Sequence, residues 1–194
     1  MPTTSCKSPW PQVLAAASFV LAAASLTPTV SSAQSDEAAS ASARAAQSQQ
    51  LSAANQQFVQ DAGTAGATEI AASKLALKNS SDKQVKDFAQ RMIADHTRLT
   101  RNLDVIAKRH GITAPPSADS SVIGSLQNLK GVDFNKAYIE QVAVGGHQKA
   151  VDLFRKESES GNDSALKAAA AKALPVISHH FAMAQQLAKN KAAS

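Results

Sequence analysis

Three histidines fall on the apolar faces of predicted helices, where imidazole nitrogens could bind a metal ion. Side chains spaced alternately by three and four residues share one face of a helix. We therefore expect His96, His147 and His180 to face one common core. The apolar series around His96 is Val85, Phe88, Met92, Leu99, Leu103 and Ile106. The series around His147 is Val144, Val151 and Phe154, and that around His180 is Leu166, Ala170, Ala173, Ile177, Ala184 and Leu187.

Carboxylates occur at positions from which they could join these histidines. Glu69 lies within a fourth apolar series, and Glu140 precedes His147 by seven residues, which is about two turns of an α-helix. Asp95 is adjacent to His96, and adjacent side chains on a helix point in different directions. We expect Asp95 to support the site from behind or to bind at a helix interface. The candidate metal-site residues are therefore Glu69, Asp95, His96, Glu140, His147 and His180.

Burying three imidazoles and a carboxylate without a shared partner would cost several kcal/mol. A divalent cation held between the helices would satisfy them together, and a His-rich mononuclear site suits Fe, Zn, Cu or Ni. A carboxylate-bridged di-iron centre is less well supported, because the chain has no Glu-x-x-His pair. The alternative is a structural or interaction module with a metal-free network, in which Glu69 or Glu140 is ionised against one histidine.

Other chemistries find little support in the sequence. The single cysteine, Cys6, excludes disulfide scaffolds and CxxC zinc sites, and no G-x-S-x-G or phosphate-binding loop is present. The net charge of +5 is too small and too dispersed to predict a nucleic-acid partner. A metal-dependent enzyme would require an open coordination position, so the sequence leaves catalysis undecided.

Four long segments carry the periodicity of amphipathic helices, and no sustained strand-like alternation occurs. This pattern predicts an all-α, ferritin-like four-helix bundle with one longer crossover between helices two and three. We expect Ser52 to begin the first helix, Ser81 to cap the second, Asp133 the third and Asp163 the fourth. The expected helices cover about 52–78, 81–111, 133–160 and 163–189, with a short helical turn at 122–129.

The first 33 residues resemble a secretory signal peptide. An apolar run of about 14 residues from Val13 to Leu26 is shorter than the roughly 20 that a membrane span needs. Small residues at 31–33 predict cleavage before Gln34, leaving no transmembrane span. We expect a flexible tether at 34–50, a helical domain at 51–190, and a periplasmic or outer-membrane-associated protein with at most weak attraction to the envelope.

Two motifs resemble those of a known family. Residues 89–96 fit A-x-R-M-x-x-D-H and residues 174–180 fit L-P-x-x-x-x-H, and the segments from Phe58 to Ala71 and from Phe134 to Phe154 add to the likeness. Together they resemble the exported bacterial domain of unknown function 4142 over about residues 58–187. The resemblance implies a ferritin-like helical bundle and periplasmic or outer-membrane association, but no established activity.

The sequence departs from this family beside His147. The family usually carries an Asp-His pair in the third helix, whereas Gly145 and Gly146 precede His147 here. Glycine in a helix interior costs about 1 kcal/mol relative to alanine, so the pair indicates a bend or a close helix contact. We expect the missing carboxylate to weaken or alter the site.

Overall fold

The computed structural model describes residues 51–113 and 116–193, and in these ranges it contains helices and no strands. Its long helices are α2 (Ala53–Asn79), α3 (Lys83–Arg109) and α7 (Ser164–Ala192). A further continuous helical stretch combines α5 (Gly131–Ala137), η1 (Tyr138–Val144) and α6 (Gly145–Ser160). The predicted all-α four-helix bundle is therefore confirmed. The predicted leader and tether lie outside the described residues.

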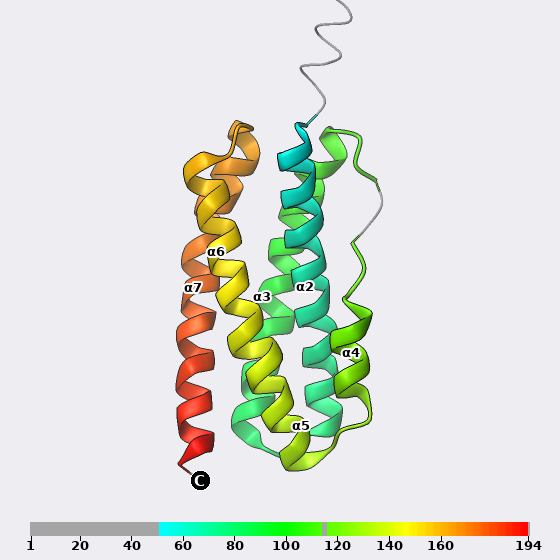
Figure 1. Ribbon diagram of the computed structural model, residues 1–194, viewed down its shortest axis with the longest axis vertical. Coiled ribbons are helices and arrows are strands. Elements are labelled where there is room, and N and C mark those ends of the chain that lie inside the picture. The colour runs from blue at the N-terminus through cyan, green and yellow to red at the C-terminus, as the bar shows by residue number, and fades with distance from the viewer. Residues whose placement is uncertain (1–50, 114–115, 194) are drawn as a thin grey trace, which may run out of the picture. The chain divides into compact units, whose positions relative to one another are not determined.

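The helices form two antiparallel hairpins that pack against each other (Figure 1). Residues 80–82 join α2 to α3, and residues 161–163 join α6 to α7. The hairpins meet where α3 packs on α7 and α2 packs on α6. The connection from 110 to 130 carries the short helix α4 (Ser120–Gln127) along α2 and is the predicted long crossover. As a result, α3 and α6 run in the same direction.

The expected apolar faces form the core. Every apolar residue predicted to face inward on α7 is buried, and so are most of those on α3. At one end, Phe134 and Tyr138 stack with ring centroids 5.7 Å apart. At the other end, Phe58 contacts Phe154 edge-on at 5.3 Å. The middle of the bundle, between these two aromatic clusters, holds the buried polar residues Glu69, His96, His147 and His180. None of the helices described is both long and apolar enough to span a membrane.

Of the three expected N-caps, only Asp163 is confirmed, and Ser52, where the first helix was expected to begin, is its N-cap. Ser52 Oγ accepts the Asn55 N–H, and Asp163 caps α7 by accepting the N–H groups of Ala165 and Leu166. The expectations for Ser81 and Asp133 are wrong. Asp82 caps α3, since its Oδ1 accepts from Gln84 at 2.8 Å and Val85 at 3.2 Å. A glycine with φ of 55°, Gly131, starts α5 after Lys130, so the helix begins two residues before Asp133 without a side-chain cap.

A π-helix, η1, interrupts the third long helix and ends three residues before His147. It was not predicted from the sequence. Its wider turn brings the Glu140 carbonyl oxygen toward residue 145, where a Cβ would lie 3.0 Å from it. Such a contact is tighter than most side chains tolerate, so glycine suits position 145. Because a π-turn contains more residues than an α-turn, η1 also changes the angular relation between residues on either side of it.

Replacing Asp82 by alanine should destabilise the bundle by about 1–2 kcal/mol, because it removes a helix cap and the contact with Lys191. Asp82 Oδ2 lies 2.7 Å from Lys191 Nζ at the far end of α7. Ser81→Ala is the matched control, since Ser81 is exposed, and should change stability by less than about 0.5 kcal/mol. Urea unfolding of both variants makes the comparison, and equal effects would contradict the assignment of the cap.

The Asp82 effect should also depend on pH. The hydrogen bond from Lys191 lowers the pKa of Asp82, with backbone N–H groups of α3 adding to the shift. A carboxyl with a lowered folded-state pKa stabilises the fold above its unfolded pKa, and that stability is lost as the pH falls through the folded value. The difference between wild type and Asp82→Ala should therefore be constant near pH 7 and decrease below about pH 4.

Candidate metal centre

Three imidazoles from three helices meet in the middle of the bundle. His96 comes from α3, His147 from α6 and His180 from α7, and their exposures are 4%, 0% and 1%. Their ring centroids lie 5.2–5.5 Å apart. One ring nitrogen from each lies within 4.8 Å of the others. The convergence predicted from the three apolar faces is therefore present.

The hydrogen bonds of His96 and His147 indicate which nitrogen of each ring carries the proton. His96 Nδ1 lies 2.9 Å from Glu69 Oε2, and His147 Nδ1 lies 2.9 Å from the Ala143 carbonyl oxygen. Each acceptor requires an N–H donor, so both Nδ1 atoms are protonated and both Nε2 atoms retain a lone pair in the neutral rings. These two Nε2 atoms are 3.3 Å apart. Facing lone pairs repel at this distance unless a proton or a cation lies between them.

His180 is held in the same manner by a different acceptor. Its Nε2 donates to Asp95 Oδ2 at 2.9 Å, and Asp95 also pairs with Arg98 at 3.3 Å. The other nitrogen, Nδ1, is buried and has no hydrogen-bond partner among the described residues. Each of the three rings thus has one nitrogen fixed by an oxygen acceptor and a second nitrogen available to bind an ion.

The buried carboxylate of Glu69 supplies negative charge to the centre. Burial raises its pKa, but electrostatic interaction with His96 and His147 and the hydrogen bond from His96 outweigh burial, so that the net pKa is lowered. Burial lowers the pKa of His147, against the opposing charge of Glu69. Burial also lowers the pKa of His180 to about 4, despite the hydrogen bond to Asp95. The environment thus favours an ionised Glu69 and neutral rings at His147 and His180.

The structure places the predicted carboxylates in three different positions. Glu69 contacts the Nδ1 atoms, at 2.9 Å for His96 and 3.5 Å for His147, and so lies behind the rings. Asp95 lies behind His180 and accepts a hydrogen bond from it. Support of the site from behind was one of the two roles expected for Asp95. Glu140 is exposed and does not join the cluster. The seven residues from Glu140 to His147 include most of η1. Because a π-turn contains more residues than an α-turn, they do not complete two turns, and the two side chains do not share a face.

Sequence reasoning missed two contributors. The first is the Ala143 carbonyl, which orients His147 through a backbone group that no side-chain pattern reveals. The second is the fully buried pair of Tyr138 and Ser73, whose hydroxyl oxygens lie 2.8 Å apart. Phe88 packs edge-on against both Tyr138 and His147 and connects this pair to the centre. Tyr138 is the only tyrosine in the chain, and this was the one feature of the sequence that could have singled it out.

Gly146 lies beside the buried carboxylate. A Cβ at this position would be 3.5 Å from Glu69 Oε1, an ordinary contact distance. That oxygen has no hydrogen-bond partner among the residues described. The glycine is therefore not required by backbone geometry, and its effect is to leave space next to Glu69.

A comparison with known protein families shows to which family the chain belongs. Residues 40–187 match the family described as Domain of unknown function (DUF4142). The chain belongs to the DUF4142 family. No curated protein and no solved structure gives a significant match. Membership of DUF4142 thus brings no activity, and the function must be argued from the centre itself.

In the metal-free protein, Glu69→Ala should lower the free energy of unfolding by about 2 kcal/mol, because it leaves the His96 Nδ1–H without an acceptor in the core. Glu140→Ala, which removes an exposed glutamate of the same bundle, should change it by less than about 0.5 kcal/mol. Denaturant unfolding in the presence of a chelator measures both. A stabilised Glu69→Ala protein would show that the carboxylate is an uncompensated buried charge.

Proposed function

We propose that the bundle binds one divalent metal ion through His96, His147 and His180, in metal handling or stress protection of the bacterial envelope. Glu69, Asp95 and the Ala143 carbonyl hold the rings rather than the ion. Metal-bound histidines commonly donate their second N–H to a carboxylate or a backbone carbonyl, which fixes the tautomer and raises the basicity of the ligand. All three rings have such a partner.

The single observation that carries this proposal is the contact between His96 and His147. Their Nε2 atoms are 3.3 Å apart, and the tautomers indicated by their Nδ1 contacts direct a lone pair of each ring to this contact. Two nitrogens bound tetrahedrally to one ion at 2.0–2.1 Å would themselves be about 3.3–3.4 Å apart. An ion would also compensate the charge of Glu69, for which no lysine or arginine partner is found among the described residues.

Three imidazole donors restrict the identity of the ion. Nitrogen ligands suit Zn²⁺, Cu²⁺, Ni²⁺ and Fe²⁺ better than Mg²⁺ or Ca²⁺, which prefer oxygen. Three protein ligands leave the fourth position of a tetrahedral ion for water or another small molecule, as in catalytic zinc sites.

A metal-free core network is the second candidate, and the same contact favours it. A proton shared between the Nε2 atoms of His96 and His147, 3.3 Å apart, would form one imidazolium and compensate Glu69. The protein would then be a structural or interaction module. The two candidates differ in metal content and in how stability responds to added metal.

The metal proposal predicts near-stoichiometric metal in the protein purified without an affinity tag, or after equilibration with Zn²⁺, Fe²⁺ or Cu²⁺. His180→Ala should weaken binding by at least about tenfold, since it removes a ligand. His179→Ala is the matched control, because the neighbouring His179 is exposed, and should retain the wild-type affinity. Elemental analysis and calorimetric titration measure stoichiometry and affinity.

A folded wild-type protein that stays metal-free after these equilibrations would overturn the metal proposal and favour the network. Binding should also stabilise the fold by about 2.7 kcal/mol at a metal concentration one hundred times the Kd. If His180→Ala and His179→Ala lost metal affinity equally, the ion would not be bound by His180.

Export is a separate part of the proposal and is supported by the leader-like composition of residues 1–33. We expect the protein recovered from the periplasmic fraction of its native bacterium to begin at Gln34. Mass spectrometry of the intact protein gives this N-terminus directly. A cytoplasmic protein that retains Met1 would contradict export and leave the metal proposal unaffected.

A further inference from the structure

A cavity of about 330 Å³ lies inside the bundle next to the histidine cluster. All four long helical segments contribute to its wall, and Glu69, Asp95 and His96 line the part nearest the cluster. Small residues on α2 and α7 leave this volume open, because alanine has only a methyl side chain and glycine has none. They include Ala62, Ala65, Gly66, Ala169, Ala170 and Ala173.

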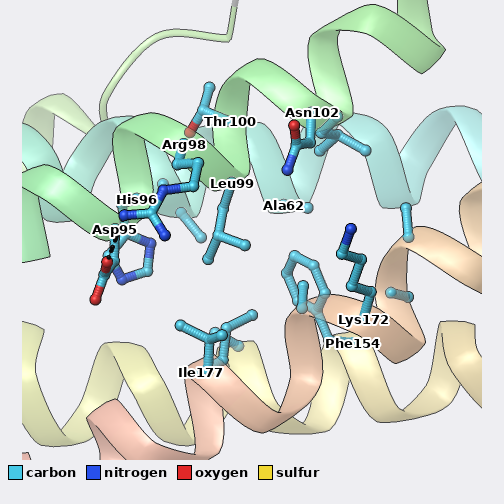
Figure 2. Close-up of a pocket in the computed structure, with 18 of the residues that line it drawn as sticks. Ala62, Asp95, His96, Arg98, Leu99, Thr100, Asn102, Phe154, Lys172 and Ile177 are labelled. Atoms are coloured by element: carbon cyan, nitrogen blue, oxygen red, sulfur yellow. Dashed lines mark hydrogen bonds and ion pairs between the residues drawn. The ribbon is translucent and has the colours of Figure 1, made fainter.

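The body of the cavity is apolar. Leu99 on α3 and Ile177 on α7 face each other across it, with Phe154 farther along (Figure 2). A dry apolar cavity of about 150 Å³ is enough to bind benzene, and ligand pockets typically have volumes of about 300–1,000 Å³. The present cavity is therefore large enough for an apolar group of more than six carbon atoms.

One positively charged group on the wall has no ion-pair partner among the described residues. Glu69 is paired with His96, and Asp95 is paired with both His180 and Arg98. Lys172 also lines the cavity, and no acidic partner for it is found in the part of the chain that the structure describes. Figure 2 shows its amine extending from α7 into the space between the helices. Since Lys172 is exposed, this charge lies at the mouth.

We propose that the cavity binds a small monocarboxylate with an apolar body, with the carboxylate at Lys172 and the apolar part between Leu99 and Ile177. The apolar body gains from leaving water, and the charged group remains at the solvent boundary beside a cation. The bound molecule would lie next to His96 and Glu69. Its binding does not require a metal ion, so this proposal and the metal proposal can fail independently.

The test compares octanoate with 1-octanol by calorimetric titration of the metal-free protein in the presence of a chelator. Octanoate should bind about fivefold more tightly than octanol, a ratio that corresponds to about 1 kcal/mol for a partly exposed charge pair. Lys172→Met should abolish this preference without preventing octanol from binding. Lys167→Met, which removes an exposed lysine of the same helix that does not line the cavity, should leave the preference unchanged.

Filling the cavity should prevent both ligands from binding. Ala173→Leu places a larger side chain on a buried part of the wall, and Ala169→Leu does so at a half-buried position in case the first variant does not fold. Each should reduce affinity more than tenfold. Ala171→Leu, at an exposed position outside the wall, should have no effect. Absence of octanoate binding at millimolar concentration, equal affinity for octanol, or unchanged binding in the filled variants would overturn the proposal.

Discussion

The centre of this bundle depends on one buried negative charge. Glu69 is 3% exposed, and its carboxylate contacts imidazole rings rather than lysine or arginine side chains. An isolated carboxylate in a protein interior costs several kcal/mol, so the surrounding groups must stabilise it. The Nδ1–H of His96 is directed to it, and this leaves the Nε2 of His96 available to bind an ion. The chemistry of the cluster follows from the position of that carboxylate.

The π-helix determines which side chains join the cluster. In a regular α-helix, Glu140 and His147 would share a face two turns apart, as expected from the sequence. With η1, Glu140 is exposed, and the Ala143 carbonyl accepts from His147 instead. A backbone oxygen carries no net charge, so the centre has only one fully buried carboxylate. π-turns are rare overall, but those that occur often lie at functional sites. The position of η1, which ends three residues before His147, agrees with this tendency.

Much of the fold could be predicted from the sequence, because helix periodicity and apolar faces are local patterns. The inward positions of His96, His147 and His180 follow from spacing alone, and so does the long crossover. The errors have local physical causes. Asp82 replaces Ser81 as the cap because a carboxylate reaches two N–H groups and also pairs with Lys191. The position of Glu140 could not be predicted, because no side-chain pattern in the sequence specified a π-turn.

The spacing of residues in the sequence could not show which group accepts a hydrogen bond from each imidazole ring. Periodicity shows which residues face the core, but it does not show which of two ring nitrogens meets an acceptor. The role of Glu69 behind the rings follows from distances between helices. A supporting role for Asp95 was one of the two expected, but spacing did not show that it supports His180 rather than His96. The same holds for the cavity, since a series of alanines predicts close helix packing as readily as it predicts a space.

The distribution of the three histidines along the chain has a consequence for the order of events in folding. His96 belongs to the first hairpin, whereas His147 and His180 belong to the second, and the crossover of residues 110–130 separates the hairpins. Neither hairpin alone brings the three rings together, and the contact between residues 95 and 180 closes a loop of 85 residues. Such non-local contacts form after local helical ones. The centre is therefore completed only when the two hairpins dock.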